Sequence, residues 1–150
     1  MITPASGARV ALVTGGSGGI GKACGRRLAE HGYDVVLTAR REGPLREAAE
    51  QIGARWVVAD ASEPAGFAAA LAELPTVGLL VHAAGVLGGT YARKQTFEQW
   101  RTIMAANLDS CFVVTAAALP KMVAGSRFIF ISSSAAHEPM PGRKASTATK

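Results

Sequence analysis

The sequence predicts an α/β fold with a doubly wound parallel sheet, and two patterns carry that prediction. Short apolar runs alternate with helix-like segments from one end of the chain to the other, which is the order of elements in βαβ units. Several runs, such as residues 78–82, are apolar at every position and not at every second one. Continuous apolarity is typical of parallel strands that helices cover on both faces.

We expect five strands, at residues 9–14, 35–38, 55–59, 77–83 and 127–132, in the spatial order 3-2-1-4-5. The expected helices lie between them at residues 20–31, 45–52, 63–74 and 96–122. Pro44 marks the start of the second helix, a position that proline favours. Apolar side chains recur at helical spacing in the longest helix and predict its buried face: Phe97, Trp100, Met104, Leu108, Cys111 and Thr115.

Composition places the chain among folded, single-domain proteins. Its 150 residues fit one domain spanning 1–150, and 49% hydrophobic against 18% charged residues argues against disorder. The net charge of +5 is spread over scattered pairs with no aromatic interleaving, so we expect no nucleic-acid partner. No signal peptide and no uncharged run of membrane-spanning length is seen, which predicts a cytoplasmic protein without a membrane partner. We expect no metal site.

A glycine-rich turn follows the first apolar run directly, between Val13 and Gly21. Glycines let a backbone turn tightly and let an anion come close, and the next helix would present unpaired N–H groups and its positive dipole end to that anion. The alternative is a flexible surface loop. A second apolar run ends about 20 residues further on, where a dinucleotide fold contacts the adenosine ribose. The turn therefore predicts a cradle for nucleotide phosphates.

Four motifs in order give the chain a family resemblance. They are Thr14-Gly15-x-x-x-Gly19-Ile20-Gly21, His82-Ala83-Ala84-Gly85, Asn107 on the long helix, and Ile131-Ser132-Ser133-Ser134 with Lys150 at the matching spacing. In these motifs the chain resembles the short-chain dehydrogenases/reductases, and it is similar to carbonyl reductases and ketoreductases of the NADP(H)-dependent type. The resemblance implies a Rossmann-like fold and hydride transfer between a nicotinamide cofactor and a carbonyl or alcohol substrate.

The chain departs from the family pattern in two places. The family has Tyr-x-x-x-Lys where this chain has Ser146 four residues before Lys150. The chain also stops at Lys150, where the family continues with further strands and a substrate-covering loop. Truncation after the fifth strand would leave residues 128–131 as an unpaired apolar edge. We therefore expect a fragment of a longer protein, a complementing chain at that edge, or a homo-oligomer.

The resemblance implies a set of cofactor-binding residues. They are Gly15, Ser17, Gly19, Ile20 and Gly21 in the turn, Asp60 and Ala61 at the adenine, and Ala84 and Gly85 at the adenosine ribose. Asp60 could equally be a turn or N-cap residue. Arg40 stands where an acidic residue would favour NAD(H), so we expect NADP(H), with Arg40 and Arg41 pairing with its 2′-phosphate. The alternative is that both arginines are solvated surface charges.

The same resemblance implies four catalytic positions. Ser133 would donate a hydrogen bond to the substrate carbonyl, with Ser132 and Ser134 as rivals, and Asn107 would link to Lys150 through a water or a carbonyl. Lys150 would assist a proton donor at position 146. A serine hydroxyl is a far weaker acid than a phenol, so Ser146 predicts impaired catalysis. Tyr91 is a remote substitute donor, and His82 is expected to be structural.

Two functions follow from these expectations. The first is an NADP(H)-dependent oxidoreductase that Ser146 impairs. The second is a non-catalytic NADP(H)-binding pseudoenzyme, or a fragment that needs a partner chain.

Overall fold

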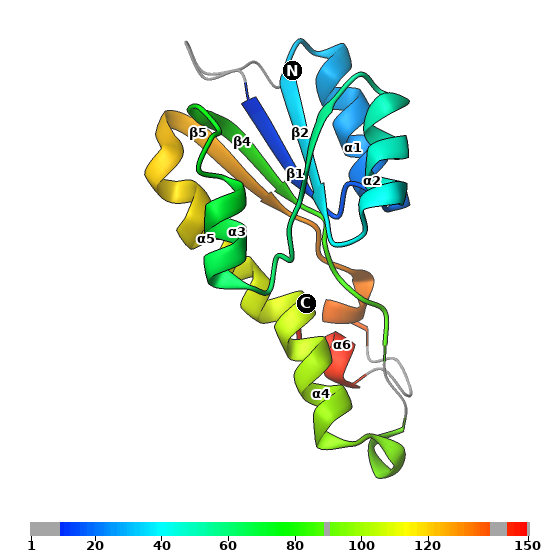
Figure 1. Cartoon of the computed structure of the whole chain (residues 1–150). Helices are drawn as coiled ribbons and strands as arrows, with labels where there is room; N and C mark the ends of the chain where they lie inside the picture. Colours follow the sequence, from blue (N-terminus) through cyan, green and yellow to red (C-terminus); the bar gives the residue numbers. More distant parts are fainter. Residues whose placement is uncertain (1–9, 89–90, 139–143, 150) are drawn as a thin grey trace.

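The computed structural model describes residues 10–88, 91–138 and 144–149. Within them the chain forms one parallel sheet with helices on both faces (Figure 1). Lys150, one of the expected catalytic residues, lies outside the described residues.

The sheet has five strands in the order β3-β2-β1-β4-β5, which confirms the predicted fold class and strand order. The strands are β1 (Val10–Thr14), β2 (Asp34–Ala39), β3 (Arg55–Val58), β4 (Val77–His82) and β5 (Met122–Phe130). Thr14 pairs in register with Thr38 of β2 on one side and with His82 of β4 on the other. The carboxyl ends of the three central strands therefore lie level with one another.

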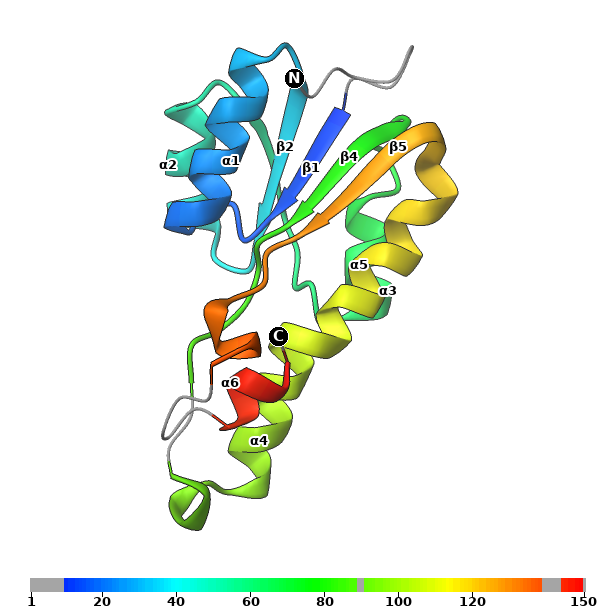
Figure 2. The ribbon, with the colours of Figure 1, turned by 180° about the vertical axis from the view of Figure 1, so that it is seen from behind.

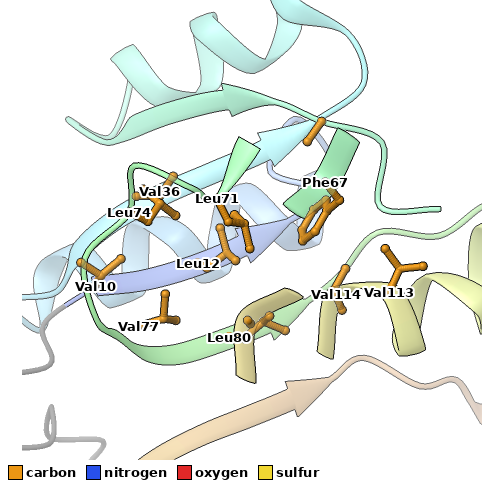
Figure 3. Close-up of a cluster of buried hydrophobic side chains, with 12 residues drawn as sticks. Val10, Leu12, Val36, Phe67, Leu71, Leu74, Val77, Leu80, Val113 and Val114 are labelled. Carbon is orange, nitrogen blue, oxygen red and sulfur yellow. The ribbon is translucent and has the colours of Figure 1, made fainter. Parts of the chain in front are cut away.

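Helices α1 (Gly19–Glu30) and α2 (Glu42–Glu50) cover one face of the sheet, and α3 (Pro64–Ala70) and α5 (Ser110–Ala118) cover the other (Figure 2). Each face holds its own buried apolar cluster. On the face covered by α3 and α5, Phe67 and Val114 pack on the sheet beside Leu12 and Leu80 (Figure 3). Because both faces are covered, the central strands β1 and β4 are buried at every position, and their sequences are apolar almost throughout.

The first turn of α2 differs from its prediction. The helix begins at Glu42, and Pro44 is its third residue instead of its first. Proline is tolerated there because N–H groups in the first turn have no partner within the helix. The helix predicted at residues 63–74 is also shorter, since α3 ends at Ala70.

The long helix runs from Phe97 to Lys121 and is not uniform. It consists of α4 (Phe97–Met104), a π-helical segment η2 (Ala105–Asp109), α5, and a 3-10 turn η3 (Leu119–Lys121). A capping box starts it, because the Thr96 hydroxyl accepts from the Gln99 N–H while the Gln99 side chain accepts from the Thr96 N–H. By length and composition alone, this helix is apolar enough to cross a membrane. In this fold its α5 part packs on the sheet, while α4 extends past the end of the sheet (Figure 1).

The predicted buried face of the long helix is wrong. Phe97 is 77% exposed and Leu108 is 44% exposed. The residues that are buried instead are Ile103, Asn107, Ser110, Val113, Val114 and Ala118. Phe97 begins α4, which extends past the end of the sheet (Figure 1). Further along, the prediction assumed one 3.6-residue period, whereas the π-helical segment holds more residues per turn and shifts the face that follows it. The prediction also favoured apolar residues for the buried face. Two of the buried residues are polar: Ser110 bonds to His82 at the end of β4, and Asn107 bonds to Val86 in the segment after β4.

Candidate functional site

A cleft of about 260 Å³ opens where the strands end at their carboxyl side. In a sheet of this order, the chain leaves β1 and β4 in opposite directions, and ligands bind in the crevice between them. The segments after four strands supply its walls: Thr14, Gly15, Ser17 and Gly18 after β1, Arg40 and Arg41 after β2, Asp60, Ala61 and Ser62 after β3, and Ala84, Gly85 and Val86 after β4. Ala106, from the π-helical segment, closes one side.

Three glycines of the turn are required by the packing of the protein itself. Gly15 has φ +68°, and a Cβ there would lie 2.7 Å from the Ala84 nitrogen. A Cβ on Gly21 would overlap the carbonyl oxygen of Gly15, and one on Gly16 would lie 2.6 Å from the Leu37 Cβ. These contacts bring β1, β2 and the segment after β4 closer together than side chains would permit.

Gly19 is different, because a Cβ there would meet nothing within 4 Å. It begins α1, whose N-cap Gly18 has no side chain to accept from the first N–H groups. The first turn of α1 contains no acidic residue. The helix therefore presents a positive end and open space beside the cleft, an arrangement that fits a phosphate group.

Positive charge and one carboxylate meet at the far end of the cleft. Asp60 accepts hydrogen bonds from the Ser62 backbone N–H at 2.9 Å and from the Ser62 hydroxyl at 2.7 Å. Partial burial opposes ionisation of Asp60, but these two bonds and the charge of Arg40 outweigh it and hold its pKa below the ordinary aspartate value. The carboxylate is thus kept ionised beside Arg40.

Because this pKa is lowered on folding, the ionised Asp60 stabilises the folded chain. That contribution is full above the ordinary aspartate pKa of about 3.9 and is lost as the pH falls through the lower, folded value. We expect Ser62→Ala to raise the pKa of Asp60, since it removes the side-chain donor. A carbon-13 titration of the Asp60 carboxyl in both proteins measures this, and coincident curves would contradict it.

Asn107 ties three segments together. Its Oδ1 accepts from the Val86 N–H at 2.7 Å, and its Nδ2 donates to the Val86 carbonyl at 3.1 Å. The same Nδ2 donates to the Thr149 hydroxyl at 3.2 Å, which in turn donates to the Ser146 carbonyl at 2.8 Å. Asn107 is therefore a buried bridge from the segment after β4 to the short helix α6 (Lys144–Ala148), which lies beside α4 (Figure 2).

Two further expected catalytic residues, Ser133 and Ser146, lie beyond β5. Ser133 is exposed and caps the 3-10 turn η4 (Ser134–Ala136), with its Oγ accepting from the Ala135 N–H at 3.3 Å. Ser146 lies on α6 and is buried. A second cavity of about 230 Å³ separates the end of β5 from Asn107 and is lined by Ser132 and Thr149 among others. Tyr91 lines neither cavity and lies 58% exposed, with the Arg93 guanidinium over its ring.

The structure brings most of the expected cofactor-binding residues to one cleft. Seven of them line it: Gly15, Ser17, Arg40, Asp60, Ala61, Ala84 and Gly85. Gly19, Ile20 and Gly21 do not line it, and Ile20 points its side chain outward at 59% exposure. Sequence reasoning missed Ser62 and Ala106. The Asp60-x-Ser62 spacing is typical of an aspartate turn and could have indicated the first, whereas nothing local indicates the second.

Comparisons with known proteins identify the family of the chain. The family model described as short chain dehydrogenase matches residues 9–150. Sulfoacetaldehyde reductase 2 of Chromohalobacter salexigens is 32% identical, and NADP-dependent 3-hydroxy acid dehydrogenase YdfG of Escherichia coli K12 is 33% identical; each match covers 94% of this chain. It covers 61% and 60% of those proteins, so the chain spans about three fifths of their length.

Solved structures give the same result. A serine dehydrogenase from Escherichia coli superposes with a TM-score of 0.86 at 32% identity, covering 93% of this chain and 69% of that one. A short chain dehydrogenase from Shigella flexneri complexed with NADP gives 0.86 at 28% identity, covering 95% and 66%. A match over nearly the whole chain, in sequence and in fold, makes this chain a member of the short-chain dehydrogenase/reductase family of oxidoreductases.

Proposed function

We propose that this chain binds NADP(H) in the cleft and belongs to a protein that transfers hydride between NADP(H) and a carbonyl or alcohol substrate. One observation carries the proposal: Gly18, the N-cap of an uncapped helix with open space at the next residue, Gly19, lines the same cleft as Arg40 and Arg41. A diphosphate fits the first feature and a 2′-phosphate fits the second. A relative named NADP-dependent and a fold neighbour complexed with NADP support the choice over NAD(H).

Each part of the cofactor has a matching group on the chain. Backbone N–H groups of the turn would hold the diphosphate, because glycines without side chains let the phosphates come close to the backbone. The residues that would supply these groups are Gly15, Ser17, Gly19, Ile20 and Gly21. Asp60 and Ala61 would flank the adenine. Ala84 and Gly85 would lie against the adenosine ribose, because their small side chains let it approach the backbone.

When bound, a nicotinamide cofactor supplies the hydride that adds to a carbonyl carbon. The chain must then hold the carbonyl oxygen and deliver a proton to it. Ser133 would donate a hydrogen bond to this oxygen, and position 146 would supply the proton with help from Lys150. Asn107 holds α6 through Thr149, and so fixes where position 146 lies.

The second candidate function is cofactor binding without turnover. Ser146 favours it, since an aliphatic hydroxyl releases a proton far less readily than a phenol and this one lies buried. Under this alternative the chain is an NADP(H)-binding pseudoenzyme, or a part of a protein that needs a partner chain. Substituting position 146 separates the two, as argued in the Discussion.

We also propose a small-molecule substrate, a cytoplasmic location and an oligomeric or complemented state. Among the described strands, β5 pairs on one side only, and Phe130 at its end is 44% exposed. Phe112 on the long helix is 75% exposed. A second copy or a complementing chain would cover these apolar surfaces.

Arg40→Ala tests the cofactor choice. Losing a charge-assisted pair with a 2′-phosphate costs about 1.5–3 kcal/mol, so the dissociation constant for NADP+ should rise by about 10- to 100-fold. That for NAD+ should stay unchanged, because NAD+ lacks the phosphate. Calorimetric titration of both nucleotides measures the difference, and Arg26→Ala is the matched control, because Arg26 is exposed and does not line the cleft. Equal losses for NAD+ and NADP+ would contradict the assignment.

A further inference from the structure

His82 is the last residue of β4, and it is buried with both ring nitrogens in hydrogen bonds. Its Nδ1 lies 2.7 Å from the Thr14 hydroxyl, and its Nε2 lies 3.0 Å from the Ser110 hydroxyl. Thr14 and Ser110 are themselves fully buried. The ring also packs edge-on against Phe130, with centroids 5.9 Å apart. The cofactor and catalytic assignments above leave this histidine without a role.

The direction of each hydrogen bond follows from the two ends of this chain of contacts. At one end the Ser110 hydroxyl lies 2.9 Å from the Ala106 carbonyl, which can only accept. The Ser110 hydroxyl therefore donates its single hydrogen to this carbonyl, and its oxygen must accept a hydrogen bond from His82 Nε2–H. A neutral ring that donates from Nε2 accepts at Nδ1, so the Thr14 hydroxyl donates to it. The Thr14 oxygen is left to accept from the Ala84 N–H at 3.2 Å.

Four hydrogen bonds thus run in one direction, from the Ala84 N–H to the Ala106 carbonyl. The opposite tautomer would give Ser110 two acceptors for its single hydrogen. A doubly protonated ring would leave the Thr14 hydroxyl hydrogen without an acceptor among these contacts, so the neutral ring protonated at Nε2 is the form that satisfies both hydroxyl groups.

We call this series of four hydrogen bonds the His82 relay. Both of its ends lie in the walls of the cleft, since Ala84 and Ala106 line the cleft from two different elements. Ala84 follows β4, and Ala106 belongs to the π-helical segment. The next residue of that segment is Asn107, which holds Val86 and Thr149. The relay joins the carboxyl ends of β1 and β4 to the helix that carries Asn107.

We propose that His82 is a positioning residue, whose Nε2–H tautomer couples the cofactor cleft to the π-helical segment and to Asn107. The part of this proposal that concerns cofactor affinity rests on the proposed function. The tautomer and the mechanical coupling do not.

The first test is nitrogen-15 NMR of the histidine rings in the unliganded chain. The ring of His82 should show an unprotonated Nδ1 and a protonated Nε2, with no exchange between tautomers. The exposed His137 supplies the comparison, because histidines in water populate both neutral forms. A protonated Nδ1 at His82, or a mixture of tautomers, would overturn the proposal without any variant having to fold.

The second test is Ser110→Ala, which breaks the relay at the end far from Thr14 and Ala84. The Ala84 amide resonance should shift although Ser110 does not touch it, and the His82 ring should lose its single tautomer. The dissociation constant for NADP+ should rise about fivefold, which corresponds to one net hydrogen bond of about 1 kcal/mol. Thr115→Val is the matched control, because its hydroxyl also bonds a carbonyl four residues back but does not contact His82.

The outcomes separate the two proposals. A shifted Ala84 amide and a single tautomer, together with no NADP+ binding to the unsubstituted chain, would uphold the coupling and overturn the proposed function. The coupling would be overturned, whatever the cofactor result, by either of two outcomes. One is that Ser110→Ala leaves the Ala84 amide resonance unshifted, and the other is that Thr115→Val shifts this resonance equally.

Discussion

Ser146→Tyr is expected to raise NADPH-dependent reduction of carbonyl compounds by about 10²–10⁴-fold, the usual gain from a placed general acid. A phenol has a pKa near 10, and a neighbouring cation lowers it toward neutrality, whereas the serine hydroxyl stays protonated at any working pH. Asn107, through Thr149, already holds the carbonyl of residue 146, so the new side chain would grow from an anchored backbone. NADPH oxidation against a panel of aldehydes and ketones measures the gain.

Ser146→Phe is the matched control, because it adds the ring without the hydroxyl. Position 146 is buried, and overpacking costs about 1–3 kcal/mol, so both variants should melt lower by similar amounts. An equal gain in both variants would show that the ring and not the acid matters. No gain with tyrosine, in a folded protein that still binds NADP+, would favour the non-catalytic alternative.

Two alanine substitutions in one turn are expected to have opposite consequences. Gly21→Ala drives a Cβ into the Gly15 carbonyl and should destabilise the fold by about 3 kcal/mol, since backbone cannot yield as a side chain can. Gly19→Ala meets open space and should keep or slightly raise stability, because alanine favours a helix over glycine by up to about 1 kcal/mol. Its cost should appear only when NADP+ is added, as a rise of tenfold or more in the dissociation constant.

Thermal melting with and without NADP+ separates these two effects. Gly43→Ala controls for the substitution itself, because a Cβ there also meets nothing within 4 Å and Gly43 does not line the cleft. If Gly19→Ala bound NADP+ as tightly as the unsubstituted chain, the space at Gly19 would not be where the diphosphate lies.

Much of the fold is predictable because burial on both faces leaves a local signature. The continuous apolar runs at residues 10–13 and 78–81 mark central strands, and the spacing of the glycines marks the turn between β1 and α1. The close contacts of Gly15 with Ala84 and of Gly16 with Leu37 were not visible in that spacing. The long helix was less predictable. Its buried face includes Asn107 and Ser110, which are polar residues whose partners come from β4 and the segment after it. No period within the helix could reveal those partners.

The candidate site likewise has some features that the sequence predicts and others that it does not. Arg40 and Asp60 follow strands that end at one edge of the sheet, so their meeting follows from topology. The support given by Ser62 is local and short-ranged. Ala106 lines the cleft from a π-helical segment, which no sequence pattern indicated, and the His82 relay needs three elements in contact. Such tertiary features depend on packing between segments that lie far apart in the sequence.

The diphosphate cradle at the N-terminus of α1 is tested most directly by calorimetric titration of NADP+ into the folded chain, in parallel with NAD+. We expect NADP+ to bind at one site with a higher affinity than NAD+, and Gly19→Ala to weaken both nucleotides because both carry the diphosphate. Absence of heat for either nucleotide at millimolar concentration, in a sample whose melting is cooperative, would contradict it.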